Sequence, residues 1–147
     1  MKNNKFFLAA IVGSVVFFLL GYLVFGVLLN DFLTANSGMD KDTLAKFNKT
    51  MEQFNWYSMA LSHLAGGFAF ATIAVWTNAR TFGAGAKIGG VIGLLFALNV
   101  NCLHFGVSNM FTLNSLGVQT ACVAVIFAII TGIMAMILGT GKTTVQS

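Results

Sequence analysis

Residues 6–29 read FFLAAIVGSVVFFLLGYLVFGVLL and contain no Asp, Glu, Lys or Arg. A helix needs about 20 apolar residues to cross a hydrocarbon core about 30 Å thick, so this segment is long enough to span a membrane. Lys2 and Lys5 precede it, as basic residues precede the apolar region of a secretory signal peptide. The run is too long for a signal sequence, however, and no small-residue cleavage pattern follows it. We therefore expect a retained first transmembrane helix.

The rest of the chain repeats this apolar pattern. Of its 147 residues, 57% are hydrophobic and 8% charged, and the mean hydropathy is +0.85. A typical soluble domain carries about 25% charged residues. Three more segments long enough to span a membrane follow, at residues 56–78, 86–110 and 115–139. We predict an all-α, polytopic membrane protein, with one four-transmembrane-helix bundle over residues 1–147 and the lipid bilayer as its surroundings.

The distribution of basic residues predicts the orientation of the bundle. Five of them fall on the side of the bilayer that holds both termini: Lys2, Lys5, Arg80, Lys87 and Lys142. The other side carries three, all in the loop 30–55: Lys41, Lys46 and Lys49. Because basic residues favour the cytoplasmic side, we expect both termini in the cytoplasm and the loop outside. The net charge of +4 does not indicate nucleic-acid binding, since the basic residues form no stripe.

The outer loop 30–55 is predicted to contain a short amphipathic helix. Asp40 and Asp42 suit the start of a helix, because carboxylates there accept hydrogen bonds from free backbone N–H groups. Apolar residues then recur at helical spacing: Leu44, Phe47, Met51 and Phe54. We expect this helix to rest on the lipid interface and to run on into the second span. The alternative is a lid or a docking surface.

Small residues follow regular spacings in the third and fourth spans. Gly85, Gly89 and Gly93 are four residues apart, and Gly117 and Gly132 lie among several alanines of the fourth span. Small residues let helix backbones approach closely, which is how helices associate in lipid. These five glycines are therefore expected at helix contacts. The partner helix can belong to the same chain or to a second copy.

Polar residues gather toward the outer half of the four spans, and we treat them as a candidate binding cluster: Asn30, His63, Asn101, His104 and Gln119. Unpaired polar groups are costly in hydrocarbon, so they should face the bundle interior and bond to one another. One interpretation is a hydrogen-bonded network that fixes packing. Another is a polar pocket that opens outward. A third makes His63 and His104, at matching depth, axial ligands of a b-type haem; otherwise we expect no cofactor and no metal.

The two cysteines indicate no redox chemistry. Cys102 and Cys122 fall on different spans at comparable depth, so a disulfide is conceivable, but both are expected to be small buried residues. The chain shows no nucleophile–base arrangement, carboxylate pair or glycine-rich phosphate loop after a strand. We therefore expect no enzyme and no catalytic residues.

Four stretches of the chain carry a resemblance to a known group of proteins: FFLLGYLVFGVLLNDFLTANSG, TFGAGAKIGGVIG, FTLNSLGV and LGTGK. Through them the chain resembles small, four-helix, uncharacterised integral membrane proteins of Bacteroidetes-type bacteria. The resemblance implies a four-helix fold in a bacterial inner membrane. It supplies no substrate, cofactor or catalytic residue.

The leading hypothesis for function is a non-enzymatic accessory or assembly subunit, working as a homo-oligomer or within a larger membrane complex. The first alternative is a carrier or channel that uses the outer polar cluster to bind a small solute. The second is a haem-binding redox subunit.

Overall fold

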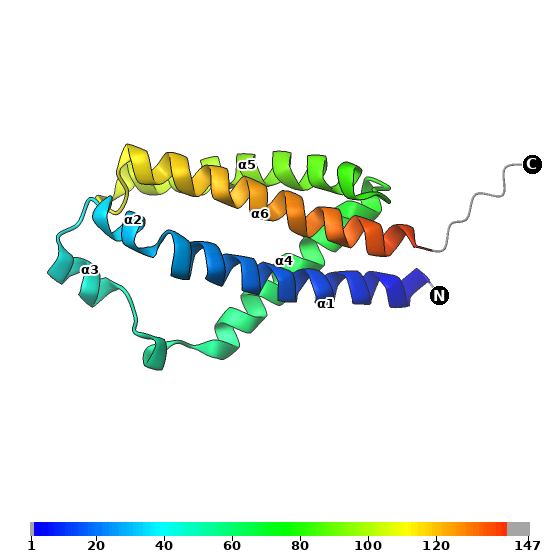
Figure 1. The fold of residues 1–147 in the computed structure, drawn as a ribbon, viewed down its shortest axis with the longest axis horizontal. Helices are drawn as coiled ribbons and strands as arrows, with labels where there is room; N and C mark the ends of the chain where they lie inside the picture. The colour runs from blue at the N-terminus through cyan, green and yellow to red at the C-terminus, as the bar shows by residue number, and fades with distance from the viewer. Residues whose placement is uncertain (1, 141–147) are drawn as a thin grey trace, which may run out of the picture.

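The chain folds into a bundle of four long helices, described here from a computed structural model that covers residues 2–140 (Figure 1). Each long helix is apolar enough to cross a membrane, so this is a multi-pass helical membrane protein. No strand is present in the described range. The elements in chain order are α1 (Lys2–Gly21), the π-helical η1 (Tyr22–Leu28), α2 (Asn30–Ala35), α3 (Lys41–Phe47), the 3₁₀ turn η2 (Met51–Gln53), α4 (Trp56–Trp76), α5 (Phe82–Val107) and α6 (Leu113–Gly139).

The bundle has two distinct ends. At the termini end, Lys5 donates a hydrogen bond to the backbone carbonyl of Thr140, which ties the start of α1 to the end of α6. The Arg80 guanidinium closes α4 at the same end by donating to the Ala74 carbonyl over 3.4 Å. The loop end holds α2, α3 and the α5–α6 turn, which lie together at the opposite side of the molecule in Figure 1.

Helix α6 is the centre of the bundle. It packs along the whole of α5 and also contacts α1 and α4, whereas α4 and α5 barely touch. The core lies where α1, α4 and α6 meet, and its buried members are Ala9, Ala10, Phe70, Ala71, Ile126, Phe127, Ile130 and Met134. Because α5 has essentially one neighbour, most of its surface faces outward.

Glycines set the distance between α5 and α6. A Cβ at Gly85 or Gly89 would lie 2.3–2.4 Å from a backbone carbonyl oxygen of α6, and one at Gly93 would collide with the Phe127 side chain. On α6, Gly132 leaves room for the ring of Phe82. Gly117 is different: it is exposed and a Cβ there would meet nothing within 4 Å. The expectation that Gly117 packs against a helix is therefore wrong within this chain.

The first span ends close to its predicted boundary, at Leu28. Its last seven residues, Tyr22–Leu28, form π turns, and the Leu29 N–H donates to Val24 O over 2.8 Å. Asn30 then begins the short helix α2. Proline is a common cause of irregular helices, but this chain has none. The irregularity in this span is the π segment.

The loop helix also differs from the prediction. Asp40 caps α3 by accepting the Thr43 N–H over 3.0 Å, and bonds from Thr43 hold the pKa of Asp40 below its ordinary value. However, α3 ends at Phe47 and does not run on into α4. The backbone of Asn48 is extended, and Asn55 starts α4 afresh by accepting the Ser58 N–H. An amide cap of this kind begins a new helix.

Candidate functional site

A buried polar pair joins α5 to α6 in the loop-end half of the bundle. The Asn101 side chain is 8% exposed, and its Nδ2 donates to Thr120 Oγ1 over 3.0 Å. Thr120 is buried as well. This bond joins two helices, as the predicted interhelical network would. Thr120, however, is not one of the five residues of the predicted cluster. A threonine in an apolar helix is a weak signal, because its hydroxyl commonly bonds within its own helix.

The two histidines lie in different surroundings. His63 of α4 is half-buried; its Nδ1 donates to the Met59 carbonyl over 2.7 Å, and its ring centre lies 4.8 Å from that of Phe17 on α1. His104 of α5 is exposed and has Phe111 beside its ring, 5.9 Å between centres. The rings therefore contact different elements, and nothing in this arrangement prepares a shared site. Haem ligation by these two residues stays a prediction.

The predicted polar cluster is not one site. Asn30 and His104 are exposed, so the expectation that all five residues face the interior and bond to one another is wrong for these two. Asn101 bonds to Thr120 alone, and His63 bonds within its own helix. What the structure does bring together is Asn30 and Gln119, which line the same pocket at the loop end.

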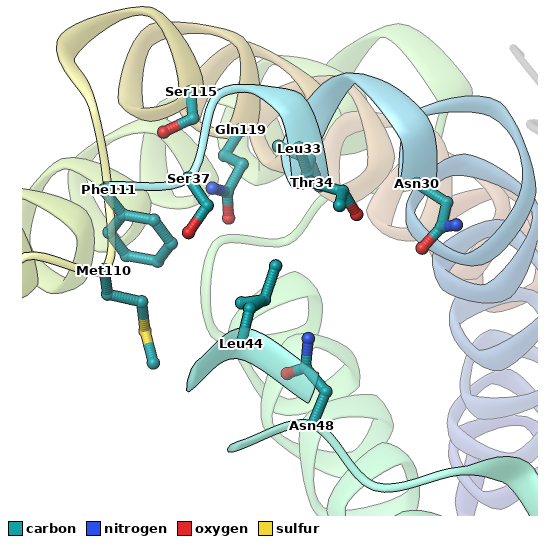
Figure 2. Close-up of a pocket in the computed structure, with 10 residues that line it drawn as sticks. All are labelled: Asn30, Leu33, Thr34, Ser37, Leu44, Asn48, Met110, Phe111, Ser115 and Gln119. Atoms are coloured by element: carbon teal, nitrogen blue, oxygen red, sulfur yellow. The ribbon is translucent and has the colours of Figure 1, made fainter. Parts of the chain in front are cut away.

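This loop-end pocket has a volume of about 210 Å³ and lies between three segments of chain (Figure 2). On one side are α2 and the α5–α6 turn with the start of α6; on the other is α3, which presents Leu44 and Asn48. Its lining residues are Asn30, Leu33, Thr34, Ser37, Leu44, Asn48, Met110, Phe111, Ser115 and Gln119. None of these ten described lining residues is charged.

The upper wall of the pocket is fixed by a clasp between α2 and the α5–α6 turn. Thr112 Oγ1 donates to the Asn36 carbonyl over 2.8 Å, and Ser37 pairs with Phe111 in an isolated antiparallel bridge. Gly38 lies so close to the Asn109 carbonyl that a Cβ would sit 2.1 Å from its oxygen. A residue larger than glycine would push the two segments apart, which makes the clasp dependent on this position.

One further polar residue has the opposite environment to Asn101. Asn99 lies in the apolar span of α5, is exposed, and makes no side-chain hydrogen bond to any other described residue. A difference of two residues turns a helix by about 200°, so the Asn99 amide points away from α6 when Asn101 points toward it. The predicted cluster omits Asn99. In the sequence, Asn99 does not fall on the stripe of small residues that is buried in the same helix, and this offset is the signal that identifies Asn99 as outward-facing.

The cysteines are both free. Cys122 of α6 is half-buried, but Cys102 of α5 is exposed, so the expectation that both are buried is wrong for Cys102. It lies on the exposed side of α5, away from the buried stripe that packs on α6. Within residues 2–140, no three His, Cys, Asp or Glu side chains gather where they could hold a metal ion.

Together these features define a polytopic helical membrane protein with a buried amide–hydroxyl pair, a small neutral pocket at its loop end and an unpartnered amide on an outer helix. Comparison of the chain with protein-family models, curated proteins and solved structures finds no match.

Proposed function

We propose that this protein is a non-enzymatic subunit of a bacterial inner membrane, with both termini in the cytoplasm, and that it works in association with another membrane protein chain. The observation that carries the proposal is the Asn99 amide. It points out of the bundle from an apolar span and has no hydrogen-bond partner among the described residues. An amide left in hydrocarbon costs several kcal/mol, so a partner that bonds to it is strongly favoured.

The position of α5 supports the same proposal. Its buried residues form one narrow stripe toward α6: Gly85, Gly89, Gly93, Ala97 and Asn101. The stripe two residues further along is exposed throughout and carries Asn99 as its fourth member: Lys87, Val91, Leu95, Asn99 and Leu103. Intramembrane polar residues usually face protein or a water-filled cavity. A partner helix laid along α5 would give Asn99 that environment.

The test is the association state of the full chain in native membranes. Extracted in polymer-bounded nanodiscs, the wild-type protein should occur in a particle that holds more than one protein chain. Asn99→Leu should shift it toward single copies, because the apolar side chain is satisfied by lipid. Ser62→Leu is the matched control, since Ser62 is exposed on α4 and its loss should leave the particle unchanged. A wild-type particle that holds one lone copy would refute the proposal.

A second candidate function is the binding of a small solute, as a carrier or channel would need, and the loop-end pocket favours it. Its volume of about 210 Å³ exceeds that of a cavity of about 150 Å³ that holds benzene. Amide groups of Asn30, Asn48 and Gln119 face a partly apolar lining that includes Leu33 and Phe111. This combination suits a neutral, ring-sized molecule that carries a carbonyl or amide group.

Benzamide is the probe for this second candidate, and benzoate is its charged control. Ligand-observed NMR on the protein in nanodiscs should show saturation transfer to benzamide and much less to benzoate, since no cation lines the pocket. Gln119→Leu should weaken the transfer, whereas Ser62→Leu should not. Equal signals for the two molecules, or for the Gln119 variant and the wild type, would remove the pocket as a specific site.

A further inference from the structure

The outer face of α5 carries a seam with coiled-coil spacing. Leu95, Asn99, Cys102 and Gly106 succeed one another at intervals of four, three and four residues, and all four are exposed. A 3–4 spacing keeps side chains on one side of a helix that pairs with another at a small crossing angle. We define these four residues as the α5 seam. The α5 seam lies on the exposed side of the helix, opposite the buried stripe that packs on α6.

The seam leaves room for close approach. A Cβ at Gly106 would meet nothing within 4 Å, so the side of α5 near its end is open. Glycines at helix contacts in lipid let backbones pack closely, as Gly89 does against α6 on the opposite side of this helix. The seam therefore combines an amide that needs a partner with a surface that a second helix can approach.

The chemistry of Asn99 identifies a second copy of this chain as the fitting partner. A carboxamide carries both donor and acceptor atoms, so it complements another carboxamide. Copies inserted with one orientation lie parallel in the bilayer, and a twofold axis along α5 would then bring each seam residue beside its own counterpart. Asn99 of one copy would then lie beside Asn99 of the other at the same depth, so no different protein is needed to supply a partner for the amide. A single asparagine at such a position is known to fix register and a two-stranded state.

We propose that α5 pairs with α5 of a second copy through the seam, with Asn99 hydrogen-bonded to Asn99 across a twofold axis and Cys102 one turn further along the same contact. This inference rests on the proposed function, because it names the partner that the Asn99 amide requires. It adds a symmetric homodimer, with parallel α5 helices and the loop-end pockets of both copies on one side of the membrane.

Cys102 supplies the test. In membranes that hold the full chain with Cys122→Ser, copper phenanthroline should oxidise the two Cys102 thiols to one disulfide. The dimer band should disappear on reduction. A disulfide needs Cα atoms within about 7 Å, a separation that a d-like position in paired helices can reach. The matched control carries Cys102→Ser and keeps Cys122, which is half-buried on α6 and should give no dimer.

Asn99 variants in the Cys122→Ser chain separate a specific pair from random collision. Asn99→Leu should weaken association about tenfold, the size of one interhelical hydrogen bond in lipid. Asn99→Gln keeps the amide and should retain most of the dimer. Energy transfer between labelled copies, diluted with lipid, reports association independently of the disulfide.

The outcomes separate this inference from the function on which it rests. A Cys102 dimer that falls with Asn99→Leu supports the seam. A dimer of equal yield in wild type and Asn99→Leu overturns it, because collision then explains the cross-link. A larger particle that holds a different protein, without self-cross-linking, refutes the homodimer and leaves the proposed function standing. A lone copy in the membrane refutes both.

Discussion

Asn99 and Asn101 are chemically identical and two residues apart, yet they meet opposite environments. Asn101 lies in the buried stripe of α5 and bonds to Thr120. Asn99 lies on the other side of the helix with no partner in the described chain. The contrast comes from helix geometry alone, since about 200° separates them. Asn101 therefore stabilises the fold within one chain, whereas Asn99 is available to a second chain.

The Asn101–Thr120 bond should be measurable as a coupling. Thr120→Val removes the acceptor and leaves the buried amide unpaired, so it should destabilise the protein by about 1–2 kcal/mol. Asn101→Leu combined with Thr120→Val should cost less than the two single changes added together, because no unpaired polar group remains. Reversible unfolding in mixed micelles gives the three free energies.

A matched control is Thr72→Val, because Thr72 Oγ1 donates to the Phe68 carbonyl of its own helix. That change removes a hydroxyl without leaving an amide unpaired, and it should show no coupling with Asn101→Leu. Strict additivity of Asn101→Leu and Thr120→Val would contradict the importance of the 3.0 Å bond between them.

At the scale of the helix, close contact between α5 and α6 depends on residues that have no Cβ. The missing Cβ at Gly89 would lie 2.3 Å from both Phe127 O and Thr131 Oγ1. The Thr131 hydroxyl oxygen is buried without a hydrogen-bond partner among the described residues, so Gly89 leaves space beside a polar atom of α6 as well as beside its backbone. Separation of the two helices would therefore affect most of the α5–α6 contact at once.

Gly89→Ala and Gly117→Ala should change stability in opposite directions. Alanine favours a helix over glycine by about 1 kcal/mol, and Gly117 has open space for the added methyl group. At Gly89 the methyl group meets atoms of α6, and overpacking of this kind costs about 1–3 kcal/mol, which outweighs the gain. We expect the first variant to be less stable than wild type and the second to be more stable.

The same unfolding assay measures both changes, and helix content by circular dichroism checks that each variant folds. Gly117 faces open space in the single chain, so a loss of stability there would mean that another chain packs on it. A Gly89 variant as stable as wild type would mean that α5 and α6 can separate at little cost.

The elements were predictable to different degrees. Runs of apolar residues predict the four spans, because hydrocarbon requires about 20 of them per helix, and the structure confirms four. The π turns of Tyr22–Leu28 carry no comparable sequence signal, because this segment is as apolar as the α-helical part of the same span. The end of α3 at Phe47 depends on an extended residue, Asn48, whose conformation helical spacing does not reveal.

For the whole molecule, the bundle was predictable and the arrangement of its polar residues was not. Depth along a span follows from residue number, so Asn101 and His104 could be placed in one half of the membrane. Which side of a helix faces which neighbour depends on packing order, and here α5 touches little besides α6. His104 and Asn99 consequently face outward. The loop-end pocket needed the clasp between Asn36 and Thr112, a contact between distant segments.

The orientation of the whole molecule is the remaining prediction. Lys5, Arg80 and Lys87 lie at the termini end of the bundle. In the sequence, five basic residues belong to that side and three to the loop 30–55, which predicts a cytoplasmic location for the termini end. In a chain without its native cysteines, Lys46→Cys in α3 should react with a membrane-impermeant maleimide in intact spheroplasts. Thr77→Cys, in the exposed turn after α4, should react only after permeabilisation, which also serves as the control for total labelling. The reverse pattern would put the loop-end pocket in the cytoplasm, where a solute from outside could not enter it directly.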